Sequence, residues 1–361
     1  MFEMISPRLR IFADEGHYYS DARGHLNPIV KVLWNALSEE ERIQIYGKWV
    51  TCFERASTIE GADIYLLTLY WKYYVERNRV QLAHEAAKRA RLAGKRLVVM
   101  SEGDFIANLP FSNAVLFERS TYRSRRHQNG NLIFAMPAFI SEYLSLYAGG
   151  KLQLRAKGSK PVIGFCGQAD GNWLDFLRRE AANRARWVSY RLGLRDWEPP
   201  PFEPTRFRRN ILLRLAESNL VETNFLLRRR YRAGYWNPNK DPFHPTRIEF
   251  VQNILNTDYT VCIRGGGNFS QRFYETLCLG RIPIFIDTDC ILPYDHLVDY
   301  SEFIVRIEPH EVPYIAEKVA DFHASLSRQR FRDLQYECRR LWQEYLSSDG
   351  FYQNFHRHPI N

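Results

Sequence analysis

The residue types best suited to hold an anion gather in one stretch, residues 261–287, which reads VCIRGGGNFSQRFYETLCLGRIPIFID. Arg264 stands directly before three glycines, and Arg272 and Glu275 follow within an amphipathic segment. Glycines between a strand and a helix let the backbone approach a ligand closely, and the first N–H groups of the helix attract negative charge. The stretch therefore predicts a site for a phosphate or diphosphate, flanked by arginines.

The elements that position these residues follow from the apolar pattern. Short apolar runs on both sides of the amphipathic segment predict a strand, a helix and a second strand, the order of a βαβ unit. On a helix over residues 268–279, one face carries Asn268, Arg272 and Glu275. Arg272 and Glu275 are therefore expected to reach each other. The alternative is an ordinary solvated face with an intrahelical ion pair, and both interpretations stay open.

Two common glycine motifs are not present in this stretch. The P-loop pattern G-x-x-x-x-G-K-[ST] requires a lysine and a hydroxyl that the sequence lacks. The pattern G-x-G-x-x-G fails as well, since Gly267 is followed by Asn268, Phe269 and Ser270. The pattern therefore excludes a Walker-type NTPase and a standard dinucleotide-binding fold.

Apolar runs alternate with helical patterns along the whole chain, which is typical of parallel sheets covered on both faces. Helices are expected at 75–93, 173–191 and 245–255, and a polar, glycine-containing linker at 149–161. We therefore expect an α/β protein with two Rossmann-like domains, at 1–155 and 156–330, and a closing C-terminal helix at 331–361. A cleft between two such domains is a common place for a ligand.

Composition bounds the class of protein. The 361 residues are 45% apolar and 14% aromatic, as in a folded globular protein. Six scattered cysteines show no metal-ligand spacing, and four of them, which stand in apolar surroundings, are expected to be reduced core residues. Neither a signal peptide nor a spanning apolar run is visible, so the sequence predicts a cytoplasmic protein.

The net charge of +9 comes mainly from clustered arginines. Three interpretations compete: a nucleic-acid surface, a peripheral membrane contact, and a site for anionic substrates. Arginine favours bidentate contacts with phosphate or carboxylate. Since no nucleic-acid-binding motif accompanies the charge, we expect no nucleic-acid partner.

The glycine-containing stretch and its continuation, RGGGNFSQRFYETLCLGRIPIFIDTDCILPYD, resemble the C-terminal signature of exostosin-like glycosyltransferases of family 47. VETNFLLR and RIEFVQNILNTDY before the stretch, and EFIVRIE after it, extend the resemblance over about residues 221–308. Weaker matches are PVIGFCGQA at 161–169 and SEGDF at 101–105. The resemblance implies a GT-B fold, with two Rossmann-like domains facing a central cleft and the nucleotide sugar bound by the C-terminal domain.

The resemblance also implies roles for particular residues. Arg264 and Arg272 match two arginines that face the donor diphosphate, and Glu275 matches an acidic residue that contacts the ribose. The turn and helix start that supply further donor contacts match Gly266, Gly267, Asn268 and Ser270. Such enzymes transfer a sugar from a UDP-sugar with inversion and without a metal at this site, so neither a cofactor nor a metal is expected. Arginines and a helix dipole are able to neutralise a diphosphate leaving group.

Inverting transfer requires a general base for the acceptor hydroxyl. Asp104 and Glu102 follow an expected strand end, and Asp14 follows another, so all three remain candidates, with Asp104 favoured. Arg228 is a further candidate for the donor site, and a solvated basic loop is its equal alternative.

Together these observations predict an inverting glycosyltransferase that moves a sugar from a UDP-sugar to a saccharide or glycolipid acceptor in surface polysaccharide assembly. It is expected to work in the cytoplasm, at the inner face of the membrane. The sequence shows neither the membrane anchor nor the second transferase domain of animal exostosins, so polymerase activity on heparan chains is not expected. The alternative is a catalytically inactive exostosin-like protein that binds or scaffolds within a polysaccharide-assembly complex.

Overall fold

The computed structural model describes residues 8–104, 106–195, 197–234 and 241–360, apart from the side chain of Arg232. The chain divides into two compact units, each built on its own sheet. Unit 1 comprises Met1–Pro137, Asp289–Tyr294 and Glu344–Asn361, and unit 2 comprises Ala138–Thr288 and Asp295–Gln343. Two parallel α/β units confirm the predicted fold class. Within the described ranges, no helix combines the length and the apolar character that crossing a membrane requires.

The sheet of unit 1 has the strand order β2-β1-β3-β4-β5-β7-β6, and only β6 runs antiparallel to its neighbour. Its strands are β1 (Leu9–Phe12), β2 (Phe53–Arg55), β3 (Ile64–Leu66), β4 (Leu97–Ser101), β5 (Ala114–Glu118), β6 (His127–Gln128) and β7 (Asn131–Ala135). Its helices are α1 (Pro28–Leu33), α2 (Glu39–Tyr46), α3 (Trp71–Glu76), α4 (Val80–Leu92) and α12 (Ser348–Gln353). Strands β4 and β5 are buried along their whole length, as the continuous apolar runs predict.

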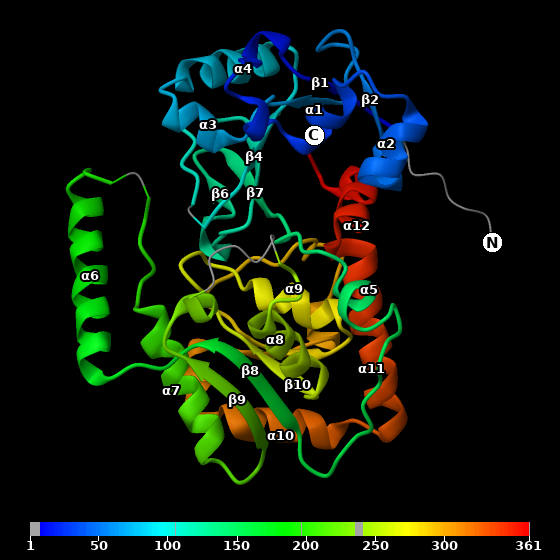
Figure 1. Ribbon diagram of the computed structural model, residues 1–361. Coiled ribbons are helices and arrows are strands. Elements are labelled where there is room, and N and C mark those ends of the chain that lie inside the picture. Colours follow the sequence, from blue (N-terminus) through cyan, green and yellow to red (C-terminus); the bar gives the residue numbers. More distant parts are fainter. Residues whose placement is uncertain (1–7, 105, 196, 235–240, 361) are drawn as a thin grey trace. The chain divides into compact units, whose positions relative to one another are not determined.

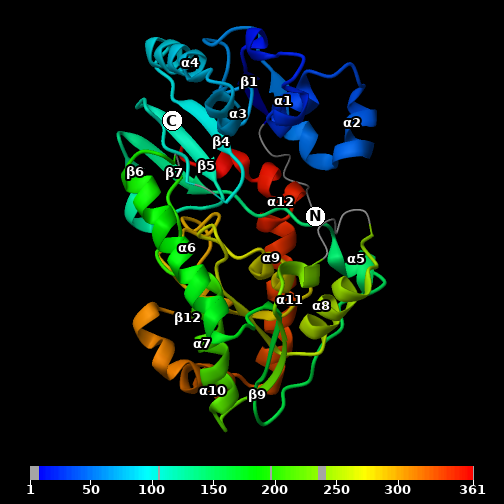
Figure 2. The same ribbon diagram turned by 60° about the vertical axis from the view of Figure 1, so that its left-hand side comes forward.

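The sheet of unit 2 has the order β12-β11-β10-β8-β9 and is parallel throughout. Its strands are β8 (Val162–Gln168), β9 (Glu222–Arg228), β10 (Tyr259–Cys262), β11 (Ile282–Ile286) and β12 (Val305–Ile307). Its helices are α5 (Tyr143–Tyr147), α6 (Trp173–Arg191), α7 (Pro204–Glu217), α8 (Pro245–Leu255), α9 (Gln271–Cys278), α10 (Ile315–Ser325) and α11 (Arg328–Leu341). Helices α8 and α9 cover one face of this sheet, and α7 and α10 cover the other (Figures 1 and 2).

One predicted helix is divided in the structure. The pattern at 75–93 predicts a single helix, but α3 ends at Glu76 and α4 starts at Val80. Between them Asn78 adopts a left-handed backbone conformation with φ of 53°. Asparagine tolerates this conformation better than most residues and commonly ends a helix. The prediction of one continuous helix is therefore wrong at this point.

The segment predicted as a linker, 149–161, packs against unit 2. The Arg155 side chain donates to the Asp258 carboxylate over 2.5 Å, and its backbone N–H donates to Gln335 Oε1 over 2.9 Å. Arg281, which is buried, donates to the Gln153 carbonyl over 2.8 Å. These contacts place the boundary between the units at Pro137 and Ala138, ahead of the predicted linker.

The C-terminal segment also differs from the expected single closing helix. Helix α11 belongs to unit 2, whereas α12 belongs to unit 1. The segment Asp289–Tyr294, which forms no strand, is also part of unit 1. In unit 1, Tyr294 Oη donates to the Phe351 carbonyl and the Tyr352 ring stacks on Trp49 at 4.3 Å. The aromatic residues of the last turns are therefore part of the core of unit 1.

All six cysteines are buried and none forms a disulfide, including the four that were expected to be reduced core residues.

Candidate functional site

The connectivity of unit 2 reverses its direction of winding at a defined place in its sheet. From β8 the chain moves to β9 on one side, and from β10 it moves through β11 to β12 on the other. Strands β8 and β10 are neighbours, so the direction of winding reverses between them. In open parallel sheets, ligands bind beyond the carboxyl ends of the strands at this reversal point. The glycine-containing stretch of the sequence begins at the carboxyl end of β10, and therefore at this place.

The loop between β10 and α9 is held from inside by its own polar side chains. Arg264, only 4% exposed, donates from Nη1 to Asn268 Oδ1 over 2.9 Å and from Nη2 to the Gly266 carbonyl over 3.2 Å. Asn268 is fully buried, and its Oδ1 also accepts the Thr288 hydroxyl over 2.6 Å. Arg264 and Asn268 thus shape the loop, and their predicted contacts with a donor stay predictions.

The glycines of this loop leave room beside the backbone. Gly266 is exposed, and Gly267 is buried. A Cβ added at Gly265 would meet no atom of the described structure within 4 Å, and Gly265 does not have a positive φ. Neither packing nor backbone strain therefore requires a glycine at position 265, whereas close approach of a ligand would favour one.

Helix α9 begins at Gln271, later than the sequence predicts, so Asn268 lies in the loop and not on the helix. Ser270 precedes the helix but its side chain accepts no hydrogen bond from the first turn, and no contact of its hydroxyl is recorded. The first N–H groups of α9 thus have no cap from Ser270. Such groups carry a partial positive charge and are able to bind an anion.

Arg272 lies on the first turn of α9, and its side chain reaches across to β8. Nη2 donates to the Cys166 carbonyl over 2.7 Å, and the guanidinium lies 4.1 Å from the centre of the Phe165 ring. A Cβ at Gly167 would lie 2.8 Å from the same Nη2, so a glycine at 167 gives the guanidinium its place. The predicted contact between Arg272 and Glu275 is wrong, because the β8 carbonyl and the Phe165 ring hold the arginine elsewhere.

Arg208, on α7, also reaches the carboxyl end of β8, although the sequence does not identify it as a site residue. Its Nη1 donates to the Gln168 carbonyl and its Nη2 to the Arg264 carbonyl, the latter over 3.2 Å. Gln168 and Cys166 lie two residues apart on β8, so Arg208 and Arg272 are bound to neighbouring carbonyls at the end of one strand. The only sequence signal for Arg208 is the basic run Arg206–Arg209, which does not show which arginine turns inward.

The two guanidinium groups share an unusual electrostatic environment. Neither forms an ion pair with a carboxylate in the described part of the chain, and the buried Nε of each makes no hydrogen bond. Burial, together with the positive charge of Arg272, lowers the pKa of Arg208 to about 10, and burial also lowers the pKa of Arg272. Glu203 lies near Arg208, but its carboxylate caps α7 by accepting the Arg206 N–H over 2.6 Å. Like charges in partial burial without a counter-ion favour binding of an anion.

Glu275 is held by residues far away in the sequence. Its Oε1 accepts hydrogen bonds from Tyr143 Oη over 2.9 Å, Gln271 Nε2 over 3.1 Å and Arg247 Nη1 over 3.4 Å. No described contact reaches Oε2, which keeps some solvent contact although Glu275 as a whole is only 4% exposed. One carboxylate oxygen therefore anchors the side chain, and the other remains able to accept hydrogen bonds from hydroxyl groups. Tyr143 and Arg247 were not found from the sequence, which carries no signal for contacts of this range.

Arg228 is compensated within the protein. Its Nη2 lies 2.7 Å from Glu249 Oε2 and 3.2 Å from the Thr246 carbonyl. A contact between Arg228 and a donor stays a prediction, but its charge already has a carboxylate partner, unlike the charges of Arg208 and Arg272.

In unit 1, the structure places Asp104 in an exposed loop after β4, and no contact of its side chain is recorded. Glu102 in the same loop lies 3.7 Å from Arg119, and Phe105 lies outside the described residues. The loop is anchored by Glu118, whose carboxylate accepts the Ala107 N–H over 2.8 Å. Asp104 therefore remains a candidate base with an unengaged carboxylate.

Glu118 gives unit 1 an expected pH dependence. Burial raises the pKa of Glu118 to about 8. As pH rises from about 5 to 8, the unfolded chain loses this proton while the folded chain keeps it, so stability should fall over this window. We expect the melting temperature to decrease by roughly 5 °C more in the wild type than in Glu118→Gln between pH 5 and 8, as measured by thermal unfolding. Equal pH slopes for the two proteins would contradict this assignment.

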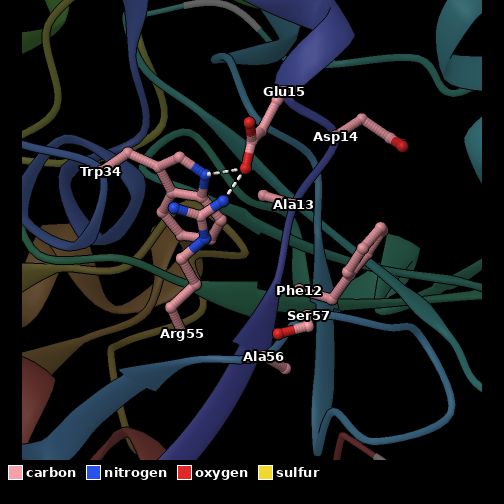
Figure 3. A pocket seen from close by; sticks show the side chains of 8 residues that line it. All are labelled: Phe12, Ala13, Asp14, Glu15, Trp34, Arg55, Ala56 and Ser57. Carbon is pink, nitrogen blue, oxygen red and sulfur yellow. Dashed lines mark hydrogen bonds and ion pairs between the residues drawn. The ribbon is translucent and has the colours of Figure 1, made fainter.

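Asp14, the third candidate base, is engaged within unit 1. Its carboxylate accepts hydrogen bonds from the Tyr65 hydroxyl and from Arg89 Nη1, the latter over 2.5 Å. It lines a pocket of about 480 Å³ beyond the carboxyl ends of β1 and β2, and Figure 3 shows its carboxylate pointing away from Glu15. Glu15 is bound there by Trp34 and Arg55. These contacts make Asp14 less suited to accept a proton than Asp104.

Comparison with known proteins gives a consistent result over part of the chain. No family model matches the chain. Exostosin-1 homolog of Caenorhabditis elegans is 28% identical over 102 residues, covering 28% of this chain and 26% of that protein. Probable beta-1,4-xylosyltransferase IRX10L of Arabidopsis thaliana is 28% identical over 91 residues, covering 23% of this chain and 21% of that protein. Part of the chain is thus similar to an exostosin homologue and to a plant xylosyltransferase. This confirms the resemblance predicted from the motif, and the chain spans about a quarter of the length of the curated relatives it matches.

Solved structures with detectable similarity to the chain include Anabaena Alr3699/HepE in complex with UDP and glucose, at 10% identity and a TM-score of 0.36, covering 97% of this chain and 98% of that chain. A glycosyltransferase from Rickettsia africae is 10% identical with a TM-score of 0.37, covering 98% of this chain and 97% of that chain. TM-scores this low do not establish a shared fold, so the fold assignment rests on the sheet topology described above.

Proposed function

We propose that the protein is a nucleotide-sugar-dependent glycosyltransferase that moves a sugar from a UDP-sugar to a saccharide or glycolipid acceptor. The observation that supports this most is the pair formed by Arg208 and Arg272, which lacks carboxylate partners and lies at the winding reversal of a parallel sheet. The pair lies beside the glycine loop of an exostosin-like sequence, where a diphosphate would complete the charge balance.

In the proposed reaction, an acceptor hydroxyl attacks the anomeric carbon with inversion, and the bond from that carbon to the diphosphate oxygen breaks. The negative charge that develops on the departing UDP is stabilised by Arg208, Arg272 and the first turn of α9. The hydroxyl proton passes to a carboxylate, for which we propose Asp104, since its side chain is exposed and unengaged.

The nucleoside half of the donor is assigned to Glu275. A carboxylate anchored through Oε1 presents Oε2 in a fixed direction, and ribose hydroxyls are suitable donors for it. Tyr143 and Arg247 act as positioning residues for Glu275. We further propose that the reaction takes place at the cytoplasmic face of a membrane during surface polysaccharide assembly, which the excess positive charge of +9 supports.

Release of UDP from a panel of UDP-sugars, offered with monosaccharide and disaccharide acceptors, tests this proposal. We expect release from at least one donor, with turnover in EDTA within about twofold of the untreated rate, because arginines supply the positive charge at the diphosphate. Loss of turnover in EDTA would contradict the metal-free part of the proposal. Binding of UDP without release from any donor would indicate an inactive binding protein.

A further inference from the structure

Helix α6 of unit 2 carries its large apolar side chains on the outside. We call these residues the α6 stripe, and it consists of Trp173, Leu174, Leu177, Val188 and, just beyond the helix, Leu192. All five side chains are exposed, with Trp173 at 68% and Val188 at 59%. Trp173 and Leu177 are four residues apart, Leu177 and Val188 eleven, and Leu174 and Val188 fourteen. These spacings place the side chains on one side of an α-helix. An apolar face on a helix normally packs inward, so the stripe requires another explanation.

The opposite face of α6 attaches the helix to its own unit. Asn183 Nδ2 and Trp187 Nε1 each donate to the Pro200 carbonyl over 3.0 Å, and Arg179 Nη2 donates to the Arg229 carbonyl over 3.4 Å. Figure 1 shows α6 standing apart from the helices that cover the sheet of unit 2. These hydrogen bonds fix the rotation of the helix, and so keep the stripe directed outward.

The charges on α6 are predominantly positive. The helix has five arginines and two acidic residues, an excess of three positive charges. Both acids are engaged: Glu180 pairs with Arg184 over 3.2 Å, and Asp175 accepts the Asn172 N–H over 3.3 Å at the start of the helix. Arg178 and Arg191 are exposed beside the stripe. By the same spacings Arg184, paired with Glu180, also lies on the outward face, between Leu177 and Val188. The helix therefore combines exposed apolar side chains with an excess of arginines on and beside the same face.

We infer that the α6 stripe and its bordering arginines dock the protein onto an anionic membrane surface. A helix with exposed apolar side chains and arginines on and beside the same face is suited to the interface between lipid headgroups and acyl chains. The arginines complement anionic lipids, and the apolar side chains enter the boundary of the acyl region. At 19 residues, with seven of them charged, α6 lies on the membrane surface rather than crossing it.

Docking through α6 does not depend on the proposed transferase activity, and the two succeed or fail separately. If the acceptor is a glycolipid, the same contact brings the enzyme to it.

Co-sedimentation with vesicles tests the inference on the full-length protein. Vesicles of phosphatidylcholine with about 30% phosphatidylglycerol are compared with pure phosphatidylcholine, at low and high salt. We expect binding to the anionic vesicles, at least tenfold weaker binding to neutral ones, and weakening by salt. The double variant Leu177→Glu with Val188→Glu should bind the anionic vesicles at least tenfold more weakly than the wild type. The double variant Arg178→Gln with Arg191→Gln should lose about fivefold in binding for each arginine removed.

Ile45→Glu combined with Leu92→Glu is the matched control, because both side chains are exposed and lie on α2 and α4 outside the stripe, and the two substitutions change the net charge equally. It should bind vesicles like the wild type. Because all substituted side chains are exposed, the melting temperatures should stay unchanged. Wild-type protein that stays in solution with anionic vesicles would overturn the inference, as would variants in the stripe that bind normally. A dimer in solution that dissociates in Leu177→Glu, without vesicle binding, would overturn it in favour of a second copy of the chain.

Discussion

Arg272→Ala should abolish sugar transfer and weaken binding of UDP, while the protein stays folded. The side chain is a partly buried guanidinium without a carboxylate partner, held by the Cys166 carbonyl and the Phe165 ring. Its place and charge suit the diphosphate of a donor, and removing one such contact typically costs about 10²–10³-fold in turnover. Calorimetry should show UDP affinity reduced by at least about tenfold.

The fold should tolerate this change, because burial of a charge without a counter-ion costs folding free energy, and the substitution removes that charge. Phe273 and Leu277, which pack α9 into the core, remain in place. Arg214→Ala provides the control, since Arg214 is an exposed arginine on α7 and its removal changes the net charge equally. Arg272→Lys should recover little activity, because a lysine lacks the planar fork of an arginine. A fully active Arg272→Ala protein would contradict the proposed donor site.

Asp104→Asn should lose turnover by about 10²–10⁴-fold and keep its affinity for UDP. A general base acts on the acceptor hydroxyl, so its loss affects the chemical step and leaves donor binding unchanged. Asp104 is an exposed, unengaged carboxylate, so the substitution should not alter the melting temperature. Steady-state rates and UDP titrations on the same preparation measure both quantities.

Glu102→Gln and Asp14→Asn complete this comparison, since the sequence left all three carboxylates as candidates. Glu102 pairs with Arg119, and Asp14 is bound by Tyr65 and Arg89, so each has a structural role that its substitution would disturb. Normal turnover in Asp104→Asn would remove Asp104 as the base and leave the choice to these two residues.

The sequence predicts the elements of this protein well where hydrophobic patterns are long. Helices α6 and α8 occupy the predicted residues 173–191 and 245–255, and β4, β5 and β11 coincide with apolar runs. Parallel strands buried on both faces leave a continuous apolar signal, which needs no tertiary information to recognise. The division between α3 and α4 was missed because it depends on the backbone of one residue, Asn78.

The side-chain partners at the site could not be predicted from spacing. Arg272 and Glu275 are close enough along a helix to pair, yet Arg272 bonds to a carbonyl 106 positions away and Glu275 to a tyrosine 132 positions away. Arg208 reaches the same strand end from α7. These contacts follow from how the strands and helices of unit 2 pack, and a local pattern contains no information on packing partners of that range.

The extent of each unit was also beyond the sequence. Segment Asp289–Tyr294 and the chain from Glu344 belong to unit 1, although the chain between and before them builds unit 2. Their aromatic residues, such as Tyr294 and Phe351, pack together in unit 1 at a ring distance of 5.6 Å. Composition along the chain assigns each segment to the domain of its neighbours in sequence. It therefore does not show that two late segments pack back into unit 1.

Titration of the wild-type protein with UDP by calorimetry tests the central claim most directly, because the claim is that the Arg208 and Arg272 pair and the glycine loop hold a nucleoside diphosphate. We predict saturable binding with a dissociation constant between about 1 µM and 1 mM, and at least tenfold weaker binding of uridine, which lacks the phosphates. No binding of UDP at several times the upper limit of this range, or equal affinities for UDP and uridine, would contradict the account.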